Sequence, residues 1–197
     1  MSTGGLILFV KNPLPGRVKT RIAATAGTET ALAIYRALLA RLREVVSQLP
    51  VERYAYFTDH LGSEDEWPPA IYHRRLQCGS DLGERMHNAI EEVLQLHAAA
   101  VLVGSDIPGL HPALLQQAFH ALDEADVVLG PATDGGYYLV GMKHPCPDMF
   151  QGIAWSTPDV LAQTLDKLKK LGKKTLLLPP LTDIDTEADW QRLGWDL

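Results

Sequence analysis

Short apolar runs alternate along this chain with longer segments of helical periodicity, and this alternation constrains the fold more than any other feature of the sequence. Residues 6–10 and 99–104 have the length and the apolar composition of buried strands. Residues 28–48 instead carry their apolar side chains on one stripe of a long helix. Such alternation is typical of a sheet covered by helices, so we predict an α/β fold.

The same patterns predict the remaining elements. Thr157 and Pro158 indicate a helix start, with Thr157 as the N-cap and Pro158 at the first helical position, and Gly172 is placed to end that helix. Thr186 and Asp189 resemble a capping pair at the start of a closing helix. Further strands are predicted at 53–58, 71–75, 127–130, 137–142 and 175–178, and further helices at about 83–96, 112–124 and 186–193.

Composition excludes several classes of protein. With 197 residues, 46% hydrophobic and 21% charged, the chain is expected to form one domain over residues 1–197. No apolar run approaches the roughly 18 residues of a membrane span, so we expect a cytoplasmic protein without a membrane partner. Cys78 and Cys146 predict neither a disulfide framework nor a zinc site. The net charge of -6 argues against nucleic acid as a partner, and the oligomeric state is left open.

A basic loop follows the first predicted strand. Residues 11–21 read Lys-Asn-Pro-Leu-Pro-Gly-Arg-Val-Lys-Thr-Arg, with four cations and no acid. A loop that leaves the carboxyl end of a strand in an open α/β sheet lies where such folds bind ligands, so it predicts a phosphate site. Gly16 is the only glycine in the loop, so side chains must do more of the binding than backbone. A solvated basic loop is the alternative. The predicted phosphate-binding residues are Lys11, Gly16, Arg17, Lys19 and Arg21.

An aspartate follows the second buried strand. The sequence Gly-Ser-Asp-Ile-Pro at 104–108 places Asp106 directly after the apolar run. A carboxylate held at the edge of the sheet can bind Mg²⁺ or Mn²⁺, which takes one or two protein carboxylates together with phosphate oxygens and waters. Alternatively, Asp106 is a turn residue or a cap for the following helix.

A glycine-rich turn joins two predicted strands near residue 134. Asp134 could accept hydrogen bonds from hydroxyl groups, while Gly135 and Gly136 would let a small molecule approach the backbone and Tyr137 would offer a stacking face. We predict catalytic roles for Asp106 and Asp134. The alternative is an ordinary hairpin, because Asp-Gly-Gly is a common turn sequence.

Two further carboxylates precede the closing helix. Asp183 and Asp185 are two residues apart, and we expect that they cannot easily share one metal. Asp185 is the predicted second metal ligand, although the choice between it and Asp183 stays open. The alternative for Asp185 is an interaction with the helix dipole.

Taken together, these motifs resemble a known family. Residues 9–21, 77–86, 104–108, 130–141, 155–157 and 183–186 are similar to radical-SAM/selenodomain-associated transferases, also called arsenosugar-biosynthesis glycosyltransferases. That family belongs to the GT-A-like nucleotide-diphospho-sugar transferase superfamily, and the similarity spans almost the whole chain. The resemblance implies a Rossmann-like three-layer α/β/α sandwich with a mixed, mainly parallel sheet. It also implies a nucleotide in the amino-terminal half and an acceptor in the carboxyl-terminal half.

The resemblance also implies roles for individual residues. Asp106 would stand at the metal-binding aspartate of the superfamily, and Asp185 at the later metal ligand of related nucleotidyltransferases. Ile107 and Pro108 depart from a full Asp-x-Asp motif, which argues against bidentate metal binding by this loop. The residues implied near the base or ribose are Gln77, Gly79 and Gly83, and those implied at the acceptor are Trp155 and Ser156.

Three functions remain open at this point. In the first, a nucleotide-diphospho-sugar donates its sugar to a small acceptor. In the second, a nucleoside triphosphate is attacked at its α-phosphate, as in related guanylyltransferases, and releases pyrophosphate. The third is a nucleotide-binding domain without catalysis. The resemblance favours the first function, whereas four cations in one loop favour the second.

Overall fold

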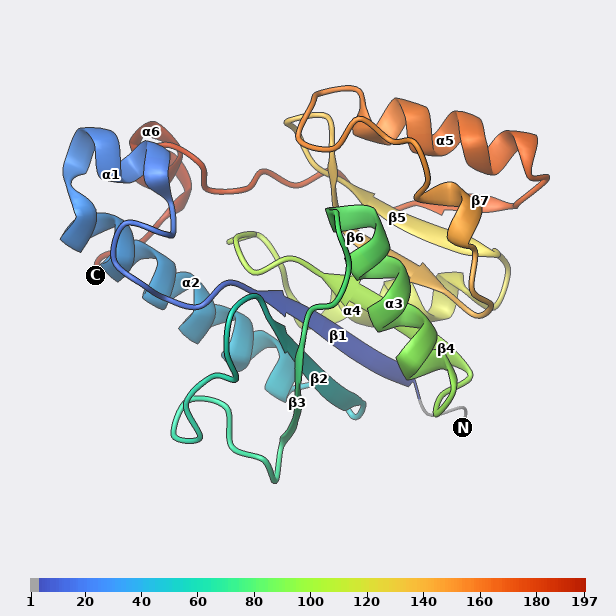
Figure 1. Cartoon of the computed structure of the whole chain (residues 1–197), viewed down its shortest axis with the longest axis horizontal. Coiled ribbons are helices and arrows are strands. Elements are labelled where there is room, and N and C mark those ends of the chain that lie inside the picture. The colour runs from blue at the N-terminus through green and yellow to red at the C-terminus, as the bar shows by residue number, and fades with distance from the viewer. Residues whose placement is uncertain (1–3) are drawn as a thin grey trace.

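The computed structural model describes residues 4–197 and contains a seven-stranded sheet with the strand order β3-β2-β1-β4-β6-β5-β7 (Figure 1). β6 runs antiparallel to both of its neighbours, and every other neighbouring pair in the order is parallel. The predicted mixed, mainly parallel sheet is therefore confirmed. The strands are β1 (Gly4–Val10), β2 (Glu52–Phe57), β3 (Tyr72–Leu76), β4 (Ala99–Val103), β5 (Val127–Pro131), β6 (Tyr137–Met142) and β7 (Thr175–Leu177).

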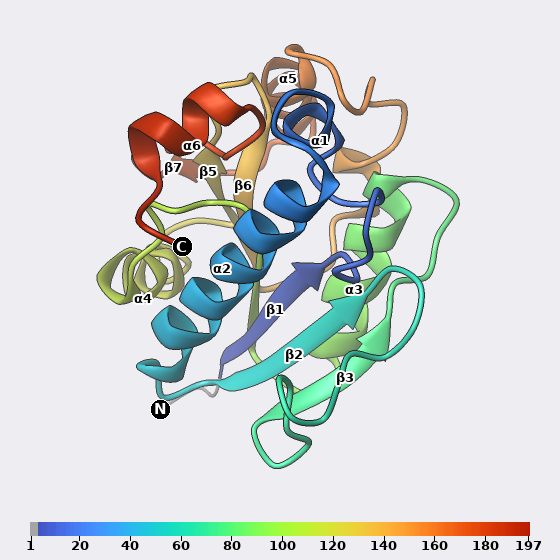
Figure 2. The same ribbon diagram turned by 90° about the vertical axis from the view of Figure 1, so that its left-hand side faces the viewer.

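Helices cover both faces of the sheet (Figures 1 and 2). Leu6 and Leu8 of β1 point into a core with α2 and α4, while Ile7 points into the opposite core with α3. This alternation of buried side chains is what a strand covered on both faces requires. The helices are α1 (Thr20–Ala26), α2 (Thr28–Ser47), α3 (Leu82–Leu94), α4 (Pro112–Ala121), the 3-10 turn η1 (Pro147–Met149), α5 (Val160–Lys170) and α6 (Glu187–Leu193).

The predicted start of α5 at Thr157 is wrong. α5 begins at Val160, and its N-cap is Asp159. The hydroxyl of Thr157 instead donates to the carbonyl of Ala154 at 2.7 Å, so it closes the preceding turn. The turn also places Ser156 in the left-handed region, with φ of 65°. The predicted helix start at Thr157 did not anticipate this conformation.

Other helix ends agree with the sequence. Thr186 and Asp189 form the predicted capping box at the start of α6, and Gly172 follows α5 with φ of 65°. The short helix α1 was not predicted. Its N-cap is Lys19, a residue type that gives no start signal.

The strand order reverses direction between β1 and β4. The chain builds β2 and then β3 on one side of β1, and it places β4 on the other side. Ligands bind at such a switch point in open α/β sheets, outside the carboxyl ends of the strands. In Figure 2, α1 lies beyond the arrowhead of β1, so the basic loop emerges at this edge.

The helices lack a membrane-spanning segment. Within residues 4–197, none combines the length and the hydropathy needed to cross a bilayer.

Candidate active site

A pocket of about 370 Å³ opens at the carboxyl edge of the sheet, between β1 and β4. Loops from both sides of the switch point build its wall, and the first turns of α1 and α3 close it. Elements distant in sequence therefore supply one site, as expected for a ligand crevice of this fold. The charged and amide side chains that line the pocket are Lys11, Lys19, Arg21, Gln77, Arg85, Asp106 and Asp185.

Lys19 forms ion pairs with two carboxylates on the polar side of this pocket. Its Nζ lies 2.8 Å from Oδ2 of Asp106 and 3.5 Å from Oδ1 of Asp185, and only 6% of its side chain is exposed. Nη1 of Arg21 lies 3.2 Å from Oδ2 of the same Asp185. Asp185 lies 166 residues after Lys19 in the sequence, so only the fold brings the two side chains together. The structure thus brings both predicted metal carboxylates onto a predicted phosphate-binding cation.

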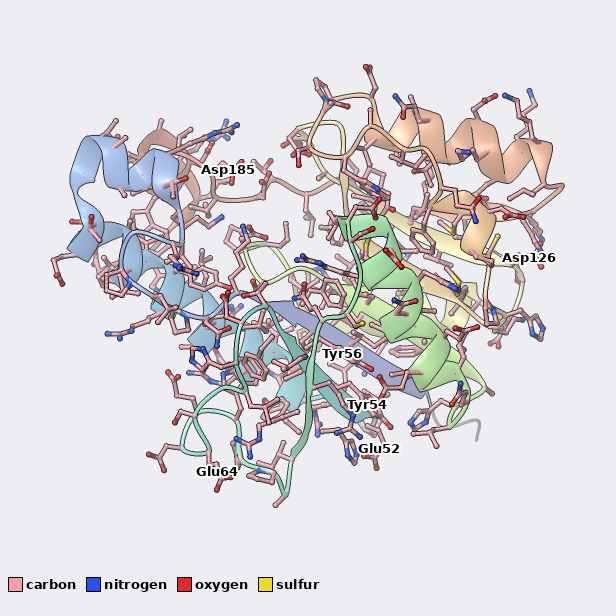
Figure 3. All side chains as sticks on the ribbon, in the orientation of Figure 1. Glu52, Tyr54, Tyr56, Glu64, Asp126 and Asp185 are labelled. Atoms are coloured by element: carbon pink, nitrogen blue, oxygen red, sulfur yellow. The ribbon has the colours of Figure 1, made fainter. Side chains whose placement is uncertain are left out.

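The backbone holds Asp185 in this position. The amide of Ile184 donates to the carbonyl of Asp106 at 3.0 Å. The side chain of Ile184 is fully buried in the core. Figure 3 shows Asp185 on the extended segment that leads to α6, beside α1. Alternate residues of an extended segment lie on the same face, so Asp183 and Asp185 both project away from the inward Ile184. Asp185 is the one of the two that meets Lys19.

Asp183 sits in a negative environment. Burial, and then the carboxylates of Asp185, Asp134 and Asp106, raise its pKa from 3.8 to about 6. Three other carboxylates are therefore close enough to Asp183 to disfavour its charged form. This crowding appears only when the tertiary fold joins the hairpin, the β4 loop and the segment before α6.

The backbone at Lys19 is unusual. Its φ of 46° and ψ of 49° are left-handed, and Ser156 is the only other non-glycine residue within 4–197 with positive φ. A left-handed residue with a side chain is strained and persists where the surroundings hold it. Val18 and Ile22 on either side are buried in the core. The loop is therefore anchored so that the Lys19 side chain turns inward.

Tyr35 ties the ends of β1 and β4 together. Its Oη accepts a hydrogen bond from the amide of Lys11 at 2.9 Å and shares another with Oγ of Ser105 at 3.0 Å. Burial raises the pKa of this hydroxyl, so it stays protonated. Sequence reasoning placed Tyr35 only on the apolar stripe of α2, and nothing local signals what its hydroxyl contacts.

Asn12 makes a second tie that the sequence did not reveal. It is 2% exposed, donates to the carbonyl of His60 at 2.8 Å and accepts from the amide of Asp59 at 2.9 Å. The loop after β1 is thereby fixed to the loop after β2. A buried, fully paired amide of this kind rigidifies its surroundings.

The outer part of the basic loop stays open to solvent. Arg17 is 69% exposed and lies 3.6 Å from Asp59, and Lys11 is exposed at the pocket wall. Gly16 has φ of 72°, and no described atom lies within 4 Å of the position its Cβ would take. These groups can reach a ligand without first breaking a buried contact.

The segment from the end of β3 to the first turns of α3 contributes polar pocket residues and two packing glycines. Gln77 donates to the carbonyl of Tyr56 at 3.1 Å, and Arg85 donates through Nε to Gly79 at 3.1 Å. A Cβ on Gly79 would lie 2.7 Å from the amide nitrogen of Arg85, and one on Gly83 would lie 2.5 Å from Cζ2 of Trp155. Packing accounts for both glycines, whereas Gln77 and Arg85 face the pocket. Arg85 is a site residue that sequence reasoning missed.

The β5–β6 hairpin is tightly packed at its tip. A Cβ on Gly135 would lie 2.0 Å from the carbonyl oxygen of Pro158, and its φ is 94°. Asp134 accepts from the amide of Gly136 at 2.9 Å and is exposed. None of the described residues 132–136 lines the pocket. Pro158 fills the space beside Gly135, so packing accounts for this glycine, and the approach of a small molecule to its backbone stays a prediction.

Tyr137 does reach the pocket. The centroid of its ring lies 6.3 Å from that of Trp155, with the two rings nearly perpendicular. Trp155 in turn covers Gly83. Burial raises the pKa of Tyr137, while Thr164 opposes that rise. Ser156 forms the strained turn beside this aromatic pair. The predicted acceptor residues thus divide into an aromatic wall and an exposed hairpin tip.

Comparison with known proteins places the chain in a family. Residues 39–157, more than half of the chain, match the family described as "Uncharacterized protein conserved in bacteria" (DUF2064). The chain belongs to the DUF2064 family. A solved structure from Desulfovibrio desulfuricans G20, named as a candidate nucleotide-diphospho-sugar transferase, is 35% identical, with a TM-score of 0.86 over 94% of this chain and 84% of that one. No protein of curated function matches the sequence.

More distant structures share the fold of this DUF2064 chain. CMP:2-keto-3-deoxy-manno-octonic acid synthetase complexed with CTP is 12% identical, with a TM-score of 0.62 over 98% of this chain and 97% of that one. Glucosyl-3-phosphoglycerate synthase from Mycobacterium tuberculosis, in complex with Mg²⁺ and uridine-diphosphate, is 10% identical, with a TM-score of 0.54 over 92% and 70%. The structural neighbours are thus transferases of the nucleotide-diphospho-sugar type and nucleotidyltransferases, and the predicted fold class is confirmed.

The carboxylates of this DUF2064 site suit a metal that arrives with phosphate. Among residues 4–197, no group of three or more His, Cys, Asp or Glu side chains is arranged to hold a metal alone. Asp106 and Asp185 nevertheless converge on one point, which the ammonium of Lys19 fills. Two carboxylates match Mg²⁺, which usually completes its shell with phosphate oxygens and water. The donor set therefore fits Mg²⁺ or Mn²⁺ carried by a nucleotide.

Proposed function

We propose that this chain is a metal-dependent transferase that acts on a nucleotide-activated donor and moves a sugar from a nucleotide-diphospho-sugar to a small acceptor. The observation that carries the proposal is the meeting of Lys19 and Arg21 with Asp106 and Asp185 at the pocket. Cations suited to phosphate and carboxylates suited to a divalent ion are the two requirements of a metal-bound nucleotide. We also propose that residues 1–197 act as one domain of this type.

The donor side of the reaction would depend on charge. Asp106 and Asp185 would hold Mg²⁺ or Mn²⁺, which supplies neutralising charge to the diphosphate leaving group. Lys11, Arg17 and Arg21 would bind the phosphates. Gln77 and Arg85, together with the loop through Gly79 and Gly83, would lie along the base or ribose.

The acceptor side would align the attacking group. An acceptor hydroxyl attacks the anomeric carbon, the bond from that carbon to the diphosphate oxygen breaks, and the nucleoside diphosphate leaves with the electron pair. Asp134 would receive the proton of the hydroxyl. Tyr137, Trp155 and Ser156 would form the acceptor wall. Positioning and electrostatic stabilisation would supply most of the rate enhancement.

Two similarities support glycosyl transfer as the first choice. The motifs resemble radical-SAM/selenodomain-associated, arsenosugar-type glycosyltransferases. The 35% identical structure from Desulfovibrio desulfuricans G20 carries the nucleotide-diphospho-sugar transferase name. Membership of the arsenosugar-type group is part of this proposal.

Nucleotidyl transfer is the second candidate, and the exposed cations of the basic loop favour it. Lys11, Arg17 and Arg21 add to Lys19 and provide more countercharge than a diphosphate needs. In that reaction a phosphate or carboxylate oxygen of the acceptor attacks the α-phosphate of a nucleoside triphosphate. The bond between the α- and β-phosphates breaks, and pyrophosphate leaves.

The products of turnover separate these functions. The protein with Mn²⁺ is screened against nucleoside triphosphates and nucleotide sugars, and the compounds that raise its melting temperature are then incubated with candidate acceptors. We expect a nucleotide sugar to stabilise the protein and a nucleoside diphosphate to be released. Release of pyrophosphate would replace the first function by the second. Stabilisation by nucleotides without any product from either donor class would leave only a binding domain.

A further inference from the structure

Lys19 is a buried cation held between two carboxylates. Lysine is almost never buried unless it is paired, and Lys19 has 6% of its side chain exposed. The Asp106 and Asp185 side chains are 36% and 40% exposed, so both are far more open to solvent than the lysine side chain between them. The ammonium therefore stands at the point where the two carboxylates would share a divalent ion.

The backbone of Lys19 shows that this position is enforced. Its left-handed conformation is one that side-chain-bearing residues rarely adopt, and it sits directly before α1. Arg21, two residues later, binds the far oxygen of Asp185. The loop thus delivers two positive charges to one carboxylate, and the strain at Lys19 is opposed by the contacts that its side chain makes.

We propose that Lys19 is an internal counter-ion, which holds the cation position between Asp106 and Asp185 until a metal and phosphate arrive together. This inference rests on the proposed function, because it takes these carboxylates as the metal ligands. A metal that binds them must displace the ammonium. The displaced ammonium needs a new anionic partner, and the phosphates of the donor are that partner.

The exchange couples metal binding to phosphate binding. Without phosphate, the metal competes with a lysine that is ion-paired with these same two carboxylates, so free metal binds weakly. With phosphate present, the ammonium of Lys19 that the metal displaces can contact the phosphate oxygens instead. Binding of one ligand then favours binding of the other, and the coupling is reciprocal. The device keeps the carboxylates neutralised in the empty site and discourages binding of metal alone.

The decisive measurement is the affinity for Mn²⁺ without nucleotide. Free Mn²⁺ is quantified by electron paramagnetic resonance at pH 7.5 for the wild type and for Lys19→Met, Lys19→Arg and Arg36→Met. We expect Lys19→Met to lower the Mn²⁺ Kd by about tenfold or more, because the competing charge is gone. Lys19→Arg keeps the charge and should retain the weak wild-type Kd. Arg36→Met removes an exposed charge from α2, outside the pocket lining, and should change the Kd by less than about twofold.

Two further variants keep the test decisive. Lys19→Gly removes the ammonium and relieves the left-handed backbone, so it should give the same gain even where Lys19→Met folds poorly. Asp106→Asn in the Lys19→Met background should abolish the gain, which assigns it to these carboxylates. Melting in EDTA gives a second readout, since Lys19→Met should melt below the wild type and gain more from saturating Mn²⁺.

An unchanged or raised Mn²⁺ Kd in folded Lys19→Met and Lys19→Gly overturns the inference. No donor enters this measurement, so its outcome is separate from that of the proposed transfer reaction. A tightened Kd without turnover of any donor supports the counter-ion and rejects the transferase. Turnover with an unchanged Kd supports the transferase and rejects the counter-ion.

Discussion

The two sides of the candidate site are built by different means. On the donor side, Lys19 meets Asp106 and Asp185 across 87 and 166 residues of sequence, and buried groups such as Tyr35 fix the loop. On the hairpin side, Asp134 bonds to an amide only two residues away. The charged contacts of the donor side are therefore long-range, whereas the Asp134 carboxylate is held within its own turn. Substitutions on the donor side should change binding, and those at the hairpin should change stability or acceptor use.

The largest expected effect is on the donor side. Asp106→Asn keeps the shape of the side chain and removes its charge, so metal-dependent nucleotide binding should fall by about a hundredfold or more, equivalent to about 3 kcal/mol. Calorimetry with Mn²⁺ and the nucleotide that stabilises the protein most would measure this loss. A folded variant with undiminished Mn²⁺-dependent affinity would remove Asp106 from the metal site.

The next largest effect is on stability at the hairpin. Gly135→Ala puts a Cβ 2.0 Å from the carbonyl oxygen of Pro158 at a positive φ, and should lower the free energy of unfolding by about 2–4 kcal/mol. Gly16→Ala has a similar φ but open space around it, so it should cost only about 1 kcal/mol. Urea denaturation of both variants makes the comparison. Equal losses would show that packing on Pro158 contributes nothing.

A smaller effect should distinguish phosphate number. Neutralising Lys19 and Arg21 together to Gln should weaken triphosphate binding more than monophosphate binding. Each charge-assisted contact contributes about 1.5–3 kcal/mol before solvent screening, and screening lowers the value for exposed Arg21. Arg36→Gln, an exposed charge on α2, is the matched control for calorimetry. Equal losses of affinity for the triphosphate and the monophosphate would show that Lys19 and Arg21 do not distinguish the number of phosphates.

Asp183 should make the metal-free protein sensitive to pH. Its folded pKa of about 6 exceeds the unfolded 3.8, so the folded state binds more protons between these values and stability falls as pH rises from about 4 through 6. The full shift corresponds to about 3 kcal/mol, which solvent screening reduces to about 1–2 kcal/mol. In EDTA, Asp183→Asn should therefore stabilise the protein at pH 7.5 but not at pH 4. A gain that is the same at both pH values would contradict this assignment.

The smallest effect on nucleotide affinity is expected at Asp134. Asp134→Ala should reduce transfer to the acceptor while leaving the nucleotide Kd within about 0.5 kcal/mol of the wild type, because Asp134 lies outside the pocket wall. Product formation and calorimetry on the same sample would test both halves of the statement. Loss of metal-dependent nucleotide binding would make Asp134 a metal or ribose ligand and end the division into two sides.

The sequence predicted what depends on periodicity and missed what depends on distant contacts. The strands, the α6 capping box and the position of Asp106 after β4 follow from local pattern. The inward turn of Lys19 does not, because a left-handed lysine has no signal in composition or spacing. The fold also gives Gly135 a packing role that its turn sequence does not indicate, because Pro158, just before α5, occupies the space that a side chain would need.

The buried tie made by Asn12 was also invisible locally. A single asparagine in a loop predicts a turn, yet this one joins two loops through His60 and Asp59. Its partners lie 47 and 48 residues away, so only the parallel pairing of β1 with β2 brings them together. Arg85 was missed for the same reason, because the turn around Gly79 decides where its side chain lies.

The reversed strand β6 gives the sheet two kinds of loop at one edge. Leu139 of β6 pairs with Val103 of β4, so the hairpin tip emerges beside the carboxyl end of β4 without a crossover helix. A crossover loop leads into a helix, whereas this hairpin returns directly to the sheet and packs its tip on Pro158. The same edge therefore combines crossover loops that carry the charges with a hairpin whose position depends on the segment before α5.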